Sequence, residues 1–261
     1  MNLLTILILG LLLGIRHATD PDHVIAVTTI VSKQRHLKLA SIIGAVWGIG
    51  HTVTIFLMGA FIIFFHVVIP PRLGLFFEFC VALLLIVLGV LNLTGVLQRI
   101  MTNLNVPGFL HTHLHLHGGD PHVHIHKHME ETLENPGKKT SLSNFIQKFG
   151  IFGLARPLII GVIHGLAGSA AIALLILGSI TEASIAMIYL LVFGMGTIIG
   201  MMGITTLIGV PIIISSKKYQ KIDRYINVAS GIISLIFGAY LAYQIGIVNG
   251  LFGAVPTWNP H

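Results

Sequence analysis

The sequence predicts an all-α polytopic membrane protein with six transmembrane helices, arranged as two inverted three-helix repeats. Hydrophobic residues make up 54% of the chain, charged residues only 9%, and the mean hydropathy is +0.91. A spanning helix needs about 20 largely apolar residues, and six segments qualify. Short motifs of the first half also recur in the second half. A soluble globular domain is therefore excluded.

Short polar segments and one long polar loop separate the predicted spans. The first span contains a charged cluster, and the third has Glu78 as its only formal charge. The fourth begins after Arg156 and Pro157, a pair that suits a helix start. The fifth is rich in glycine and ends near Pro211. The six spans are predicted at residues 3–31, 37–65, 75–97, 158–180, 183–214 and 222–248.

Two motifs of the first half match motifs of the second half. Residues 14–17 align with residues 161–164 at an offset of 147, and residues 47–51 align with residues 193–197 at an offset of 146. Since each half holds three spans, an odd number, the second half is expected to lie inverted relative to the first. Chance matching among glycines is the alternative. The predicted domains are residues 1–98, the first repeat; 99–150, a His-rich loop; and 151–261, the second repeat.

Positive charges predict the orientation of the chain in the plasma (inner) membrane. The loops after the first, third and fifth spans carry most lysines and arginines, whereas the loops on the other side have only Arg72. By the positive-inside rule, both termini lie outside and the long loop lies in the cytoplasm. This distribution explains the formal net charge of +6 without nucleic-acid binding.

The segment from Arg16 to His23 places two histidines, two carboxylates and an arginine inside the first span. Charged side chains near the bilayer centre cost about 2.5 to 3.5 kcal/mol each, so they are expected to line a path or to bind a ligand. On a regular helix His17 and His23 would lie about 120 degrees apart and would not converge. Pro21 is expected to break the helix and to bring His17, Asp22 and His23 together.

The chemistry of these side chains predicts a metal site without a resident cofactor and without catalytic residues. Imidazole nitrogen with carboxylate oxygen suits nickel, cobalt or zinc, whereas the single Cys80 excludes a site with several thiolates. Asp20 is a further ligand, a partner of Arg16, or a group that orients an imidazole from behind. Two more histidines lie inside spans at motif positions, where bonding to a backbone carbonyl is the alternative. The candidate ligands are His17, Asp20, Asp22, His23, His51 and His164.

The central loop contains two tracts in which every second residue is histidine, at residues 111–117 and 122–128. Alternation around the turn-forming residues 118–121 would place both tracts on one face of a hairpin, while the remaining composition favours a flexible segment. Imidazoles bind borderline metals such as nickel, cobalt, copper and zinc. A solvating low-complexity loop is the alternative to an accessory metal-binding loop.

The motifs of the first two spans resemble a known signature, His17-x-x-x-x-Asp22-His23 followed by Gly48-x-Gly50-His51-Thr52. It is the signature of the nickel/cobalt transporter (NiCoT) family, and the chain is most similar to the shorter NicO/UreH-like members. The segment from Gly165 to Ser169 also resembles those shorter relatives. Longer members typically have eight helices, and Pro21 and Val24 differ from the commoner residues at their positions.

The resemblance implies a role in nickel or cobalt selection and transport for His17, Asp22 and His23, and extends it to His51. We therefore expect a secondary transporter of divalent nickel or cobalt, and not an enzyme. Two positive charges that cross 100 mV gain about 4.6 kcal/mol. We therefore expect uptake driven by the membrane potential, which needs no nucleotide. Efflux by proton exchange is the alternative.

An intramembrane metalloenzyme is less favoured, because the H-E-x-x-H pattern is absent. The expected partners are a divalent transition-metal ion, the lipid bilayer, and a cytoplasmic metal chaperone or metalloenzyme-maturation factors.

Overall fold

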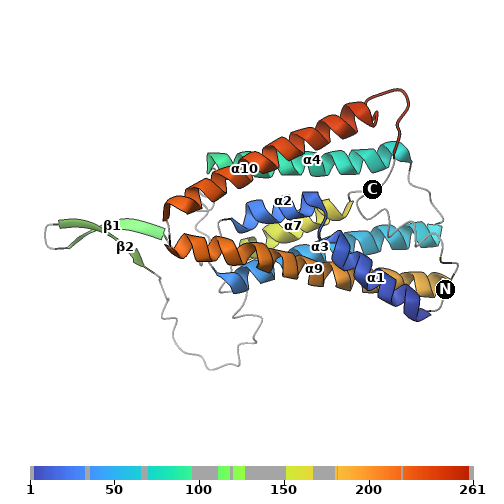
Figure 1. Cartoon of the computed structure of the whole chain (residues 1–261), viewed down its shortest axis with the longest axis horizontal. Coiled ribbons are helices and arrows are strands. Elements are labelled where there is room, and N and C mark those ends of the chain that lie inside the picture. Colours follow the sequence, from blue (N-terminus) through green and yellow to red (C-terminus); the bar gives the residue numbers. More distant parts are fainter. Residues whose placement is uncertain are drawn as a thin grey trace. The chain divides into compact units, whose positions relative to one another are not determined.

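The computed structural model describes residues 3–32, 36–65, 70–95, 111–117, 120–126, 151–166, 180, 182–218 and 220–258. The chain forms two compact units. One comprises Met1–Thr94 together with Arg156–His261, and the other comprises Gly95–Ala155. The first unit is helical, and the second contains a two-stranded hairpin (Figure 1).

Apolar helices build the larger unit. Among the described residues, four segments are long and apolar enough to cross a membrane, and a bent helix pair raises the number to five when it is counted as one span. The chain is thus a multi-pass membrane protein. The fourth predicted span, residues 158–180, is described only as far as Leu166, apart from residue 180. The helices are α1 (Leu3–His17), α2 (Pro21–Val31), α3 (Leu37–Phe65), α4 (Pro71–Thr94), α7 (Ile151–Leu166), α9 (Ala183–Lys218) and α10 (Gln220–Tyr243), which continues as the π-helical η2 (Gln244–Val248).

The first predicted span is broken, as expected. Helix α1 ends at His17, α2 begins at Pro21, and the two are bent by 54° (Figure 1). Pro21 lies in the first turn of α2, where a backbone donor has no intrahelical partner and its loss costs little. Asp20 precedes it with an extended backbone, φ −59° and ψ 143°. Because the chain turns here, the positions of the polar residues on the two sides of the break are no longer set by the geometry of one continuous helix.

The fourth predicted span begins earlier than the sequence indicates. Helix α7 starts at Ile151 and contains Pro157 in its interior. Pro211 likewise lies inside α9, which continues to Lys218 beyond the predicted span end. A proline removes one backbone donor and crowds the preceding turn. Membrane helices accommodate it because neighbouring helices and local adjustments satisfy the freed groups.

Glycines bring the helices of the larger unit into backbone contact. A Cβ added to Gly14 in α1 would overlap the carbonyl of Phe193 in α9. A Cβ added to Gly50 in α3 would overlap the carbonyl of Leu158 in α7. Small residues at such contacts let membrane helices approach closely. These contacts fix the positions of the helices that carry the polar residues.

Substitution of Gly14 by alanine tests this packing. We expect Gly14→Ala to lower the free energy of unfolding by about 1 to 3 kcal/mol, because the new methyl group meets backbone that cannot rotate away. Gly203→Ala is the matched control, since a Cβ on Gly203 in α9 would meet no atom within 4 Å. Thermal unfolding of the detergent-solubilised variants measures the difference. Equal melting temperatures for both variants would contradict the contact.

Helices α4 and α10 pack side by side (Figure 1). Side chains of the two helices also form a polar network. The Asn92 side-chain amide donates to the carbonyl of Asn227 at 2.9 Å and to the hydroxyl of Ser230 at 3.0 Å. Ser234 donates to the carbonyl of Leu85 at 2.8 Å. Interhelical hydrogen bonds of this kind stabilise helix pairs in a membrane.

The smaller unit contains a hairpin. A hairpin is one of the two structures that the sequence predicts for the His-rich loop, and a flexible segment is the other. Strands β1 (His111–His117) and β2 (Asp120–His126) pair antiparallel. The register of the two strands places a histidine opposite a histidine at three positions: His111 with His126, His113 with His124, and His115 with His122.

Candidate metal centre

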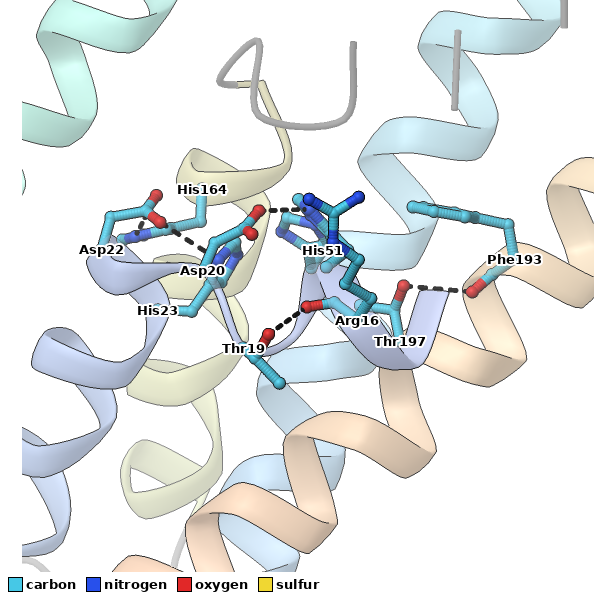
Figure 2. A network of polar contacts seen from close by, with 10 residues as sticks. Arg16, Thr19, Asp20, Asp22, His23, His51, His164, Phe193 and Thr197 are labelled. Carbon is cyan, nitrogen blue, oxygen red and sulfur yellow. Dashed lines mark hydrogen bonds and ion pairs between the residues drawn. The ribbon is translucent and has the colours of Figure 1, made fainter. Parts of the chain in front are cut away.

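The six predicted ligands lie in one cluster inside the larger unit (Figure 2). Helices α1, α2, α3 and α7 all contribute, although His164 in α7 lies more than 100 residues after the others in the sequence. Because the chain breaks between α1 and α2, side chains from the end of α1, from the link and from the start of α2 can lie in the same cluster. The residues are His17 at the end of α1, Asp20 in the link, Asp22 and His23 in the first turn of α2, His51 in α3 and His164 in α7.

Three buried histidines form the centre of the cluster, and we call them the trihistidine group: His17, His23 and His51. One ring nitrogen from each lies within 4.8 Å of the others. The side chains are 5%, 0% and 0% exposed. A metal with bonds of about 2.1 Å holds its ligand atoms about 3 to 4.2 Å apart, so modest side-chain rotation closes these rings on one ion.

His17 is held on both sides of its ring. Its Nδ1 lies 2.8 Å from Oδ2 of Asp20, and its Nε2 lies 2.8 Å from Nε2 of His51. When Nδ1–H of His17 donates a hydrogen bond to the carboxylate, Nε2 of His17 carries a lone pair and accepts a hydrogen bond from Nε2–H of His51. A carboxylate behind an imidazole fixes its tautomer and raises its basicity as a ligand. This contact suits Asp20 to orient the imidazole of His17, which is one of the three roles that the sequence suggests for it.

Asp20, Asp22 and His23 form a second set, which we call the carboxylate group. One ligand atom from each again lies within 4.8 Å of the others. Asp22 Oδ1 is 3.3 Å from Nδ1 of His23, and Asp22 Oδ2 is 3.7 Å from Nε2 of His164. The carboxylate group is less buried than the trihistidine group, since Asp20 is 33% and Asp22 14% exposed. His23 belongs to both sets.

The ring nitrogens of His23 show that the cluster is suited to a ligand. Within the described part of the chain, Nε2 of this fully buried side chain has no hydrogen-bond partner, and the same holds for Nδ1 of His51. A buried polar atom without a partner costs about 1 to 3 kcal/mol. Such atoms in a native protein require an explanation, and coordination of a metal ion provides one.

Two aromatic residues that the sequence did not single out pack against the histidines. The Trp47 ring lies 5.3 Å from the His164 ring in a T-shaped arrangement and 6.1 Å from that of His23. The Phe193 ring lies 5.6 Å from that of His17. Trp47 and Phe193 begin the second pair of matched motifs. The internal match was therefore the signal that would have identified them.

The fold and the cluster define a class of protein, a multi-pass helical membrane protein with histidines and carboxylates gathered at a break in its first span. Over 251 residues the chain is 36% identical to the urease accessory protein UreH of Bacillus sp. (strain TB-90), and the match covers 96% of each chain. The chain belongs to the UreH family, among the shorter relatives of the nickel/cobalt transporters that its motifs resemble. No family model and no solved structure matches it.

Proposed function

We propose that the chain is a secondary transporter that moves divalent nickel, with cobalt as the second candidate, across the plasma membrane through the His/Asp cluster. The trihistidine group is the observation that carries this proposal, because it places three imidazoles around one point inside a membrane protein. Imidazole with carboxylate binds nickel, cobalt and zinc in preference to magnesium and calcium. Membership of the UreH family favours nickel and cobalt among these.

We further propose that residues 1–98 and 151–261 are inverted repeats, separated by the loop at residues 99–150. Close contacts of glycines support this. Several contacts between a glycine of one half and a residue of the other are matched by a contact between the corresponding residues of the two halves. Gly196 lies 146 residues after Gly50, and their partners Leu158 and Leu11 are 147 residues apart. The matched contacts are Gly50–Leu158 with Gly196–Leu11, Gly14–Phe193 with Gly161–Trp47, and Gly89–Gly231 with Gly238–Ala82.

The proposed repeat relation extends to the cluster but leaves its ligands unequal. The pair His17 and Phe193 corresponds to the pair His164 and Trp47, with ring separations of 5.6 and 5.3 Å. The counterpart of His51 is Thr197, whose hydroxyl donates to a backbone carbonyl at 3.0 Å. The first repeat therefore supplies most of the proposed ligands, and both repeats supply an aromatic wall. A site at the repeat interface is typical of secondary transporters.

The charge distribution orients the proposed transporter with both termini outside and the His-rich loop in the cytoplasm. Uptake then runs down the membrane potential, which supplies about 2.3 kcal/mol per charge for each 100 mV. A cytoplasmic loop of histidines suits transfer of the ion to a metal chaperone or to metalloenzyme-maturation factors. Efflux would have to overcome the potential, for instance by exchange with protons.

Nickel flux into sealed liposomes tests the proposal. Purified full-length protein should accumulate radiolabelled nickel when the interior is negative, and unlabelled cobalt should compete better than zinc. Protein-free liposomes give the background. Flux that requires an opposing proton gradient, and not the potential, would replace uptake by efflux. Flux at the background level under every gradient would overturn transport.

Deletion of residues 111–128 tests the accessory role of the loop. We expect the initial rate of nickel flux to remain near that of the wild type, because the proposed path lies in the larger unit. The amount of metal retained by the protein should fall, since eight histidines are removed. A chain of full length with these histidines changed to asparagine is the matched control for loop length. Complete loss of flux in both folded variants would place the loop in the path.

A further inference from the structure

We infer that the cluster holds the transported ion at two positions in turn, one at the trihistidine group and one at the carboxylate group, with His23 as the ligand common to both. This inference rests on the proposed transport function and deepens it. It assigns a second, oxygen-rich binding position to Asp20 and Asp22, with His164 beside Asp22. The ion moves between the positions as His23 changes partners.

The arrangement of the rings around His23 supports a shared ligand. The His23 ring lies 4.8 Å from that of His17, 5.0 Å from that of His51 and 5.1 Å from that of His164. Figure 2 shows Asp22 and His164 together at one end of the cluster and His51 toward the other end. His23 is fully buried, its Nδ1 lies 3.3 Å from Oδ1 of Asp22, and its Nε2 has no hydrogen-bond partner in the described part of the chain. One imidazole can therefore serve either position.

One ion cannot use all the candidate ligands at once. Ligand atoms on a single ion lie at most about 4.2 Å apart when the bonds are about 2.1 Å long. In the described residues, the candidate atoms that approach within 4.8 Å of one another fall into two sets. His51 belongs to one set and Asp22 to the other, and no set contains both. His23 belongs to both sets, so an ion at one set takes the ligand that the other set needs. One ion therefore occupies the two sets in succession.

The two positions differ in the ions that they select. The carboxylate group offers charged oxygen atoms and is partly exposed, so it attracts a divalent cation that keeps some of its water. Oxygen ligands discriminate little between manganese and nickel. The trihistidine group is buried and offers nitrogen, which favours nickel and cobalt over manganese. Attraction and selection are thus separated between the two sets.

Asp20 connects the two positions. Its Oδ2 accepts a hydrogen bond from Nδ1 of His17 at 2.8 Å, and the same carboxylate belongs to the carboxylate group. An ion at the carboxylate group lies beside the residue that orients His17, the first ligand of the next position. The link between α1 and α2 therefore supplies a group to each position.

Binding of manganese and of cobalt to purified full-length protein in lipid nanodiscs tests the inference. Manganese reports the oxygen-rich position, and cobalt reports the nitrogen-rich position through its visible absorption. We expect His51→Ala to weaken cobalt binding by about tenfold or more while manganese binding stays near wild type. Asp22→Asn should weaken manganese binding by about tenfold or more and keep the cobalt absorption band of the trihistidine group. The control His36→Ala should change neither.

The outcomes separate this inference from the proposed function. Parallel loss of both metals in His51→Ala and in Asp22→Asn would show one shared ligand set and would overturn the two positions. If His51→Ala does not fold, as judged by size-exclusion chromatography, His51→Gln replaces it with the same expectation. Absence of nickel flux in wild-type liposomes would overturn transport, whatever the variants bind. Flux in the wild type with parallel loss of both metals would overturn the two positions alone.

Discussion

His51→Ala is expected to reduce the initial rate of nickel flux into liposomes by about 100-fold or more. The substitution removes one of the three nitrogens of the trihistidine group and breaks the 2.8 Å contact between the Nε2 atoms of His17 and His51. Loss of a group that only orients a metal ligand costs about 10- to 100-fold in affinity. Loss of a ligand itself should cost at least the upper end of that range, about 100-fold. Radiolabelled nickel uptake at matched protein density measures the effect.

The matched control for this prediction is His36→Ala. His36 is exposed, immediately precedes α3, the helix that carries His51, and lies outside the cluster. Its removal changes the number of histidines by one but leaves the proposed ligands intact, so flux should stay near wild type. Normal flux in His51→Ala, or an equal loss in both variants, would contradict the assigned role of His51.

The spans could be predicted where the local sequence is uniform and the breaker is strong. Residues 37–65 are predicted as a span and form α3 with the same bounds, because the run is apolar and polar residues flank it. The break near Pro21 was predictable because the proline lies beside charged residues that a regular helix could not bring together. The predicted start of α7 was wrong, because the prediction places Pro157 at the helix start, whereas this proline lies inside the helix. Packing against other helices decides whether a membrane helix continues through a proline.

The membership of the cluster could be predicted, but its contacts could not. Histidines and carboxylates inside apolar spans are costly, so their presence identifies them as candidates without knowledge of the fold. The pairing of Asp20 with His17 depends on the turn between α1 and α2, and that turn is not encoded by spacing alone. Trp47 and Phe193 are typical residues of an apolar span, so composition gives no reason to place them beside histidines.

The contacts of α4 and α10 show why internal repeats are only partly visible in sequence. Gly89 meets Gly231 and Leu235, and Gly238 meets Ala82 and Ile86 in the same manner. The corresponding residues are 149 residues apart, close to the offsets of the matched motifs. The flanking side chains differ because lipid accepts many apolar residues, whereas the glycine positions are restricted by close backbone approach. Contacts therefore support the proposed repeat in the third helices, where no motif does.

Asp22→Asn is expected to reduce nickel flux by about 100-fold or more while leaving insertion and folding unchanged. Asp22 lies 3.3 Å from a nitrogen of His23 and 3.7 Å from a nitrogen of His164. Imidazoles that bind a metal are uncharged, so the carboxylates must offset the two positive charges of the ion. A pair of unit charges 4 Å apart gains about 4 kcal/mol at an effective dielectric constant of 20, and a divalent ion gains more. The amide keeps the size of the side chain and removes this attraction.

The same chemical change at Glu78 is the control for this prediction. Glu78 lies in α4, where its Oε1 accepts a hydrogen bond from Nε1 of Trp258 at 2.9 Å, and it is not part of the cluster. Glu78→Gln also removes one negative charge from an apolar helix and retains an acceptor for the indole, so flux should stay near wild type. Initial rates measured over a range of nickel concentrations should show a weaker apparent affinity only in Asp22→Asn. If both variants lose flux to the same extent, the loss reflects the total charge of the spans and not a carboxylate that faces the ion.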